Sequence, residues 1–542
     1  MNQVLHVSAE CYPAAKAGGL ADVVGSLPKY MSAAGVPAAV VMPRYGLPWM
    51  YARRWQTVHV GAVRVDWRHV GYSVQLLESD ELGFPLYAVD IPGLFDRPGI
   101  YNDPPSGTPY GDEVERYLTF QQAVLQWLLS MPMAQRPRVL HCHDHHTGLI
   151  PFMVKYCPEY KPLGEIPTVF TIHNGQYQGR FSWNNVYLMP FFDSWGRGIL
   201  DWQGVINPMA AAIKCAWAVT TVSRSYLYEL HDSSLGLEPL FRSEWAKQHG
   251  ILNGIDTHVW DPKTDSRIWA RLENNDVEQF KANNKRALCE AYGLDERLPL
   301  VSFISRMVHE KGADLLPDAY RRILHSGEKV SFFVLGTGDK RVEDEFRSMA
   351  WHYRTRFNAA LEYNETVSHQ IYAGSDFLIM PSRIEPCGLN QMYAMRYGTI
   401  PIVRAVGGLK DTVPDLEDKT TPGRGIRFDQ FTVDDVQQAV HRAVSMYFNS
   451  PDVFRAVRDQ IMQIDFSWEH TVDIYFQVYK LIGAYLQNIK PDAGNKPETP
   501  KIQVTAQTPM APVAVPHHTE PQTPAVPAKT PVSRKRTSKK QV

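Results

Sequence analysis

The chain has 542 residues, 44% of them hydrophobic, and a formal net charge of −1. This length favours two large domains over one, and the balanced charge argues against nucleic acid as the main partner. The six cysteines are scattered and form no C-x-x-C pair, so we expect no zinc ribbon or thioredoxin-like site, and the chain suits a reducing cytoplasm. We recognise no signal peptide, transit peptide or membrane-spanning run.

The first half of the chain predicts a parallel sheet covered by helices. Short apolar runs alternate there with amphipathic stretches, which is the pattern of βαβ units. Helices are expected from about Leu20 and at residues 113–130, where apolar residues recur at helical spacing. Strands are expected at residues 3–10, 36–43, 84–90, 137–144, 167–174 and 217–223.

A second α/β unit is expected beyond residues 250–256, which we interpret as a crossing between domains. A helix is expected to open at residues 307–312. Its strands are expected at residues 298–306, 330–335, 375–380 and 399–404, and later helices at 433–448 and 471–486.

These patterns divide the chain into four parts. The last part is rich in Pro, Thr and Lys and poor in large apolar residues, so it cannot offset its ordering entropy and is predicted to be a disordered tail. Its basic end, residues 533–540, is more simply a solvated tail than a specific contact. The predicted parts are an N-terminal Rossmann-like domain at 1–250, a C-terminal Rossmann-like domain at 251–460, a helix packing back across the domains at 461–489, and the tail at 490–542.

Polar residues follow the predicted strands at the point where each strand ends. In the first half these residues are Lys16, Asp144, His173 and Ser223. Open α/β sheets bind ligands at the carboxyl ends of their strands. The first of these loops carries one lysine and two adjacent glycines before a helix, which suits a phosphate, although a plain βα turn with packing glycines remains an alternative.

The whole run K-A-G-G-L-A-D-V at residues 16–23 resembles the K-x-G-G-L-x-D-V signature of bacterial glycogen synthases and plant starch synthases. Further motifs of that family follow in its order, and the resemblance extends from about residue 2 to about 485. It implies the GT-B fold, α/β with two Rossmann-like doubly wound domains facing a central cleft. The further motifs are H-C-H-D-H-H-T-G-L at 141–149, T-I-H-N at 171–174, Ser305-Arg306 with Lys311-Gly312, and E-P-C-G-L at 385–389, supported by L-N-G-I-D at 252–256 and Y-G-T at 397–399.

The resemblance implies a retaining glucosyltransferase of glycogen biosynthesis. It would transfer glucose from ADP-glucose, or UDP-glucose, to the non-reducing end of an α-1,4-glucan in a bacterial cytoplasm. Two alternatives stay open: another GT-B glucosyltransferase acting on a small acceptor, and a catalytically dead glucan-binding scaffold. We expect no cofactor, no nucleic-acid partner and no membrane.

The residues expected to carry the chemistry match the family motifs one by one. Arg306 and Lys311 would neutralise the leaving diphosphate, and Glu385 and His173 would contact the donor glucose. Because Lys16 lies on the other domain, we expect the site to require domain motion. The expected substrate-binding residues are Lys16, Gly18, Gly19, Asp22, Tyr101, Asp144, Asn253, Tyr363, Cys387, Gly388 and Leu389.

The histidines at residues 141–146 also allow a metal hypothesis, because H-x-H presents two imidazoles on one face of a strand. The family string at this place carries no catalytic metal and the chain has no D-x-D motif, so we predict no metal. His145 replaces the tryptophan usual in the family, and residues 188–216 follow the family only loosely. The acceptor contacts are therefore less well specified than the donor contacts.

Overall fold

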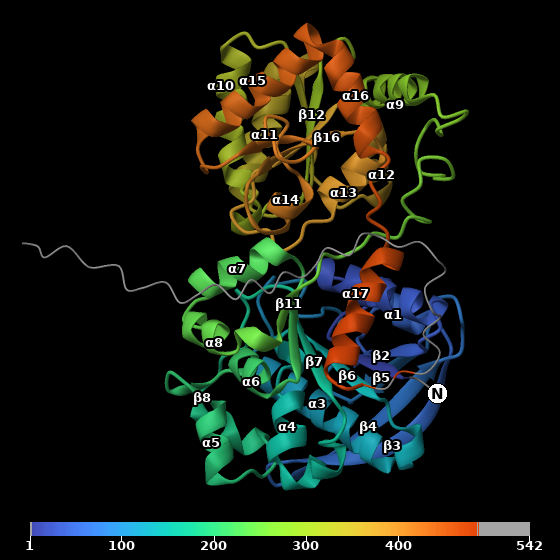
Figure 1. Ribbon diagram of the computed structural model, residues 1–542, viewed down its shortest axis with the longest axis vertical. Coiled ribbons are helices and arrows are strands. Elements are labelled where there is room, and N and C mark those ends of the chain that lie inside the picture. The colour runs from blue at the N-terminus through green and yellow to red at the C-terminus, as the bar shows by residue number, and fades with distance from the viewer. Residues whose placement is uncertain (1–2, 485, 487–542) are drawn as a thin grey trace, which may run out of the picture. The chain divides into compact units, whose positions relative to one another are not determined.

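The computed structural model describes residues 3–484 and 486, which belong to one compact unit. The predicted tail at 490–542 lies outside the described residues. Two sheets, built from different halves of the chain, organise this unit (Figure 1). No helix in the described part of the chain is long and apolar enough to cross a membrane.

The first sheet has nine strands in the order β11-β10-β7-β6-β1-β2-β5-β4-β3. Its neighbouring strands are parallel except in two pairs, β3 with β4 and β4 with β5, which are antiparallel. The central strands are buried along their whole length, as expected of a sheet covered on both faces. The strands are β1 Val4–Val7, β2 Ala38–Pro43, β3 Trp55–Val65, β4 Arg68–Leu77, β5 Leu86–Asp90, β6 Val139–His143, β7 Thr168–Ile172, β10 Ala218–Thr221 and β11 Gln248–Gly250.

The second sheet has six strands in the order β14-β13-β12-β15-β16-β17, and all its pairs are parallel. A separate two-stranded ribbon joins β8 Asp201–Trp202 to β9 Val205–Ile206. The strands of the second sheet are β12 Leu300–Ile304, β13 Ser331–Leu335, β14 Phe357–Ala360, β15 Phe377–Met380, β16 Ile400–Arg404 and β17 Ile426–Phe428.

Helices connect the strands of both sheets. The early ones are α1 Gly19–Ala33, α2 Pro48–Tyr51, α3 Glu113–Ser130, α4 Ile150–Tyr156, α5 Ser194–Leu200, α6 Pro208–Cys215, α7 Arg224–Asp232 and α8 Glu238–Ser243. The later ones are α9 Val277–Tyr292, α10 Leu316–His325, α11 Lys340–Tyr353, α12 Glu365–Gly374, α13 Asn390–Arg396, α14 Gly407–Thr412, α15 Val433–Asn449, α16 Pro451–Ile461 and α17 Trp468–Leu481.

Each sheet reverses its strand order near its middle. In the first sheet β1 has β2 on one side and β6 on the other, and in the second sheet β12 has β13 on one side and β15 on the other. The loops that follow the two neighbouring strands diverge at such a point and leave a crevice for a ligand. The loops after β1, β6, β12 and β15 are therefore the places where a site should form.

The last helix, α17, packs on the first sheet although it ends the described chain. It lies beside α1 (Figure 1), and its residues Trp468, Val472 and Tyr475 share a buried cluster with Val4 and Val139. The expected helix at 471–486 is present but begins and ends earlier. Several elements were not predicted from the sequence, among them the β3–β4 hairpin, α9, β14 and α16.

Direct contacts join the parts of the chain that carry the two sheets. The ammonium of Lys29 lies 2.7 Å from a carboxylate oxygen of Asp256. Ser225, on α7, donates its N–H and its hydroxyl to Asp411, on α14, over 2.9 and 2.5 Å. The N–H of Gly407 also donates to Glu229 over 2.7 Å. These bonds hold α7 against α14 at one border of the space between the sheets.

Candidate active site

A large cleft with a cavity volume of about 1810 Å³ opens between the carboxyl ends of the two sheets. The loops after β1, β6, β12 and β15 all contribute to its walls. Every catalytic or substrate-binding residue predicted from the family motifs lines this cleft, whereas the strand-end residue Ser223 does not line it and instead caps α7. The predicted residues that line it are Lys16, Gly18, Gly19, Asp22, Tyr101, Asp144, His173, Asn253, Arg306, Lys311, Tyr363, Glu385, Cys387, Gly388 and Leu389.

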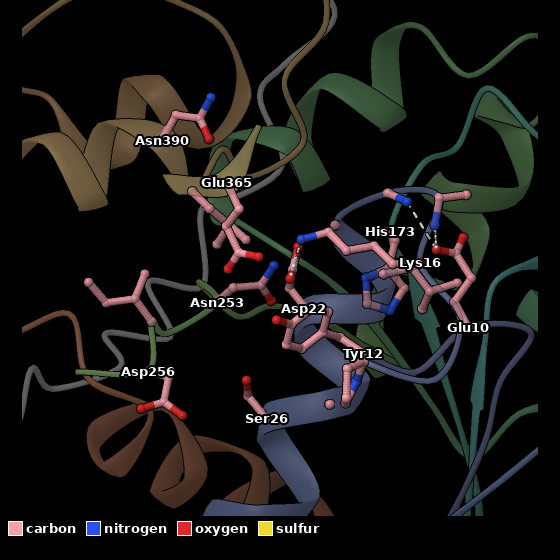
Figure 2. Close-up of a pocket in the computed structure, with 18 of the residues that line it drawn as sticks. Glu10, Tyr12, Lys16, Asp22, Ser26, His173, Asn253, Asp256, Glu365 and Asn390 are labelled. Atoms are coloured by element: carbon pink, nitrogen blue, oxygen red, sulfur yellow. Dashed lines mark hydrogen bonds and ion pairs between the residues drawn. The ribbon is translucent and has the colours of Figure 1, made fainter. Parts of the chain in front are cut away.

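The loop after β1 carries Lys16 into the cleft. Its ammonium lies 2.7 Å from a carboxylate oxygen of Asp22, which is in the first turn of α1 (Figure 2). Both side chains are partly exposed, so the pair is accessible to an incoming anion. Asp22 therefore serves as the counterion of Lys16.

A carboxylate of the chain itself already occupies part of the expected anion site. Two backbone N–H groups, those of Ala17 and Gly18, donate to one oxygen of Glu10 over 2.5 and 3.0 Å (Figure 2). The hydroxyl of Tyr101 donates to the other oxygen over 2.7 Å. Burial raises the pKa of Glu10, and these hydrogen bonds act in the opposite direction. Glu10 was missed in the sequence, although it is the only acidic residue among the first 21.

The loop after β12 presents two cations in different states. The side chain of Arg306 is exposed and forms no hydrogen bond or ion pair with the described residues. Lys311, in contrast, lies 2.7 Å from both carboxylate oxygens of Glu385, which follows β15. A hydroxyl from Ser382 also donates to Glu385 over 3.1 Å.

The backbone around Lys311 differs from the expected helix opening. Two short 3₁₀ turns, His309–Lys311 and Ala313–Leu315, come first, and α10 begins only at Leu316. Between the turns Gly312 has a φ of 69°, and a Cβ at this position would lie 2.3 Å from the carbonyl oxygen of Pro381. Only glycine fits such a close approach, which brings the loop of Lys311 against the loop of Glu385.

The loop after β15 continues into α13 with small or packed residues. Cys387 is 4% exposed, and burial raises the pKa of its thiol to about 12. Gly388 has a φ of 73°, and the side chain of Gln391 donates to the carbonyl oxygens of both Cys387 and Gly388. Leu389 precedes the first residue of α13. A thiol held in this way is a packing group rather than a nucleophile.

His173 and Asp144 form the wall next to the first sheet. Asp144 accepts the N–H groups of His173 and Asn174 over 2.8 and 3.4 Å, and it adopts a left-handed φ of 55°. Burial raises the pKa of Asp144 to about 7. A non-glycine residue held at positive φ costs conformational energy, which the bonds to the following loop help to offset.

Two aromatic residues of the predicted site differ in their setting. Tyr101 is part of the wall, where its ring stacks on His146 with centroids 4.9 Å apart. Tyr363 is 74% exposed and borders the cleft from the side of the second sheet. The position of Tyr363 suits a stacking surface that a ligand would cover.

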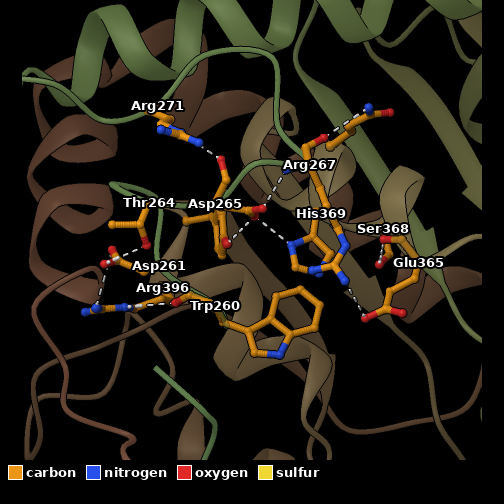
Figure 3. A network of polar contacts seen from close by, with 12 residues as sticks. Trp260, Asp261, Thr264, Asp265, Arg267, Arg271, Glu365, Ser368, His369 and Arg396 are labelled. Carbon is orange, nitrogen blue, oxygen red and sulfur yellow. Dashed lines mark hydrogen bonds and ion pairs between the residues drawn. The ribbon is translucent and has the colours of Figure 1, made fainter. Parts of the chain in front are cut away.

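A buried network supports the wall on the side of the second sheet, and it was not predicted from the sequence. Asp265 accepts hydrogen bonds from His369 and Tyr397, both over 2.6 Å, and Trp260 stacks on His369 with ring centroids 3.8 Å apart (Figure 3). Asp265 and Trp260 also line the cleft. Their partners lie more than 100 residues away in the chain, so no local pattern indicates this network.

The histidine cluster contains two groups whose atoms could approach one metal ion, but most ring nitrogens of the first group are already engaged. In the first group, His141 bonds Tyr479 and Thr171 through its two nitrogens, and His6 bonds His143.

In the second group, His145 and His146 turn their Nε2 atoms toward Glu113 while their buried Nδ1 atoms have no partner among the described residues. A ligating histidine normally donates its other ring N–H, which these cannot do. The arrangement therefore favours N–H donation from His145 to Glu113, over 3.4 Å, rather than metal binding.

Comparison with known proteins shows which family the chain belongs to. Residues 3–243 match the family model described as the starch synthase catalytic domain, and residues 284–455 match glycosyl transferases group 1. A glycogen synthase of Flavobacterium johnsoniae is 46% identical over 481 residues, which span 89% of this chain and 99% of the relative. The chain belongs to the glycogen synthase family.

Other members of the glycogen synthase family agree with this assignment. A glycogen synthase of Bacillus cereus is 37% identical over 485 residues, covering 88% of this chain and 99% of the relative. The catalytic domain of starch synthase IV from Arabidopsis thaliana, solved with ADP and acarbose, superposes with a TM-score of 0.79 at 30% identity, covering 89% of this chain and all of that one.

A sucrose-phosphate synthase of Thermosynechococcus elongatus, at 17% identity and a TM-score of 0.56, shares the fold alone. The predicted family and the predicted GT-B fold are confirmed.

Proposed function

We propose that this glycogen synthase family member transfers glucose from ADP-glucose to the non-reducing end of an α-1,4-glucan with retention of the anomeric configuration. The observation that carries the proposal is the convergence of Lys16, Arg306, Lys311 and Glu385, from loops of two sheets, on one cleft. The related starch synthase was solved with ADP, which supports ADP-glucose over UDP-glucose as the donor.

The cations of the cleft suit the leaving group of this reaction. When the bond between sugar and diphosphate breaks, negative charge develops on the phosphate oxygens, and fixed positive groups stabilise it. Arg306 has no ion-pair partner among the described residues and offers a planar fork of donors to phosphate. Lys16 approaches from the opposite wall. These cations do in this site what a divalent ion does in metal-dependent transferases.

The sugar side of the cleft is served by Glu385 and His173. Because Glu385 accepts Lys311 through both oxygens, its carboxylate is better suited to orienting Lys311 and bonding a sugar hydroxyl than to attacking carbon. Retention then follows if the acceptor hydroxyl attacks from the face that the diphosphate leaves. The wall around Asp144 and His145, from the first sheet, faces the acceptor.

The proposed domains correspond to the donor side and the acceptor side of the cleft. We take residues 1–250 as the acceptor-side domain, 251–460 as the donor-side domain and 461–489, of which 461–484 and 486 are described, as the helical segment that packs back across the domains. Closure of the two walls on the donor brings Lys16 to the diphosphate. The working compartment is the bacterial cytoplasm, and the partners are the nucleotide sugar and the glucan.

A transfer assay tests the proposal directly. Glycogen is incubated with radiolabelled ADP-glucose or UDP-glucose, with a chelator present and no metal added, and label in the precipitated glucan is counted. We expect incorporation that is faster from ADP-glucose and is lost in Glu385→Ala and Lys311→Ala. Incorporation from neither donor would reject the reaction, a strict requirement for metal would reject the cation mechanism, and full activity in both variants would reject these catalytic assignments.

A further inference from the structure

Three histidines on neighbouring strands form one hydrogen-bonded chain that ends at the cleft. His6 is on β1, His143 ends β6, and His173 follows β7; these strands lie side by side in the order β7-β6-β1. Nδ1 of His6 lies 3.0 Å from Nε2 of His143, and Nδ1 of His143 lies 3.0 Å from Nε2 of His173. His6 and His143 are fully buried, whereas His173 is 8% exposed and lines the cleft.

Burial keeps all three rings neutral. It lowers the pKa of His6 and of His173 to about 3, and that of His143 well below its ordinary value. A neutral imidazole has one N–H donor and one lone pair. Along a chain of such rings every ring must therefore donate in the same direction, and only two arrangements of the protons satisfy both hydrogen bonds.

The buried end of the chain selects between these two arrangements. Nε2 of His6 is buried and has no hydrogen-bond partner among the described residues. If the protons pointed toward His6, this nitrogen would carry a buried N–H without an acceptor, which is rarer in proteins than an unused lone pair. With the protons on Nδ1 of each ring, His6 donates to His143, and His143 donates to His173.

The neighbouring ring of His141 does not disturb this chain. Its nitrogens bond the hydroxyl of Tyr479, on α17, and that of Thr171, on β7. Its ring only stacks on that of His143, with centroids 4.3 Å apart. His141 thus contributes packing to the chain but neither donates nor accepts a proton in it.

We propose that His6 and His143 are positioning residues that hold His173 in the tautomer with its proton on Nδ1, so that the ring presents an N–H donor to the cleft. That nitrogen has no partner among the described residues and is left for an oxygen of the substrate, such as a sugar hydroxyl. The use of this donor in transfer rests on the proposed function, whereas the position of the proton does not.

Nitrogen NMR of the full chain labelled with ¹⁵N-histidine tests the position of the proton without any substrate. The signals of His173 are assigned by comparison with His173→Gln, and their shifts distinguish a protonated from an unprotonated ring nitrogen. Near neutral pH we expect the proton on Nδ1 and a lone pair on Nε2. A proton on Nε2, or on both nitrogens, would overturn the proposal even if the enzyme were fully active.

Two variants of His6 test the positioning role in the reaction. His6→Leu removes the donor at the start of the chain, so we expect a mixture of His173 tautomers and kcat reduced about tenfold, with the KM for the donor sugar changed less. His6→Asn places an amide N–H the same number of bonds from the backbone as Nδ1 of the histidine. It should therefore restore most of the population with the proton on Nδ1 of His173 and most of the kcat. His59→Leu, on β3, is the control away from the chain.

Unchanged His173 signals in His6→Leu would contradict the proposal. If His6→Leu does not fold, the wild-type spectrum and His6→Asn still decide. A wild-type protein with the expected tautomer but no transfer from either nucleotide sugar would retain this inference and reject the proposed function.

Discussion

The ammonium of Lys311 lies 2.7 Å from both carboxylate oxygens of Glu385, so two residues that are 74 positions apart form one unit at the edge of the cleft. Glu385 is 4% exposed, and Lys311 neutralises it. The two residues thus depend on each other for stability as well as for chemistry.

Comparing a single with a double replacement in this pair should distinguish its contribution to stability from its contribution to activity. Lys311→Ala leaves a buried carboxylate without its cation, so we expect a loss of about 2 kcal/mol in the free energy of unfolding and a loss of activity of at least about a hundredfold. In Lys311→Ala/Glu385→Gln the stability should return but not the activity. Urea unfolding measures the stability, and the transfer assay measures the activity. The control is Lys247→Ala, which removes a lysine from a local ion pair with Glu244, three residues earlier. Equal stability of the single and double variants would contradict this coupling.

Lys16 should act on donor binding and not on folding. Its ion pair with Asp22 is partly exposed, and such pairs contribute little to stability. We expect Lys16→Ala to weaken binding of a nucleoside diphosphate about tenfold or more in calorimetric titration, with an unchanged melting temperature. Asp22→Asn, which removes the competing carboxylate, should not weaken binding. Unchanged affinity in Lys16→Ala would remove this residue from the donor site.

Asp144 should make the stability of the protein depend on pH. Its pKa is raised from 3.8 to about 7 by burial, so between these values the folded protein binds a proton that the unfolded chain does not. Stability therefore falls as pH rises through this window and stays lower above it, by up to about 4 kcal/mol from this group.

Asp144→Asn keeps an oxygen for the two N–H groups but cannot ionise. We expect the variant to gain stability relative to wild type between pH 5 and pH 8 in urea unfolding. A constant difference across this range would show that Asp144 is ionised in the folded protein throughout.

The buried thiols should be inert in the native protein. All six cysteines are buried, and the raised pKa of Cys387 leaves almost no thiolate near neutral pH. Iodoacetamide should therefore leave activity intact, and mass spectrometry should find no label on the peptide of Cys387 until the chain is unfolded in guanidinium. Rapid labelling of native Cys387 with loss of activity would show that its loop opens.

Much of the site could be predicted because parallel sheets gather the ends of their strands. Apolar runs such as Ala38–Pro43 and Ser331–Leu335 mark strands in the sequence itself. Once they are marked, the polar residues that follow them must lie at one edge, whatever the order of the strands. This is why Arg306 and Glu385 could be assigned to one edge of the second sheet and Lys16 to the same kind of edge of the first. That the two edges face each other across one cleft was implied by the resemblance to the glycogen and starch synthases.

The partners of those residues could not be predicted, because they depend on strand order and on loop approach. The chain from His6 to His173 exists only because β6 lies between β1 and β7, and no local pattern specifies that. The hairpin β3–β4 was missed because many of its residues are exposed and a register shift interrupts its alternation. The N–H of Gly18, in the loop after β1, donates to the side chain of Glu10. This bond depends on how the Glu10 side chain turns, which no sequence pattern predicts.

The docking of α17 on the first sheet has a consequence for the synthesis of the protein. The strands of that sheet are complete once residue 250 has been made, yet Val4, Val139 and Val169 remain partly uncovered until residues near Tyr479 arrive. At 5–20 residues per second, the ribosome needs roughly ten to fifty seconds to add the roughly 230 intervening residues. During that interval the nascent chain presents an apolar surface, so a chaperone that binds such surfaces has its longest opportunity on the first half of the molecule, and truncation before α17 should leave that half dependent on it.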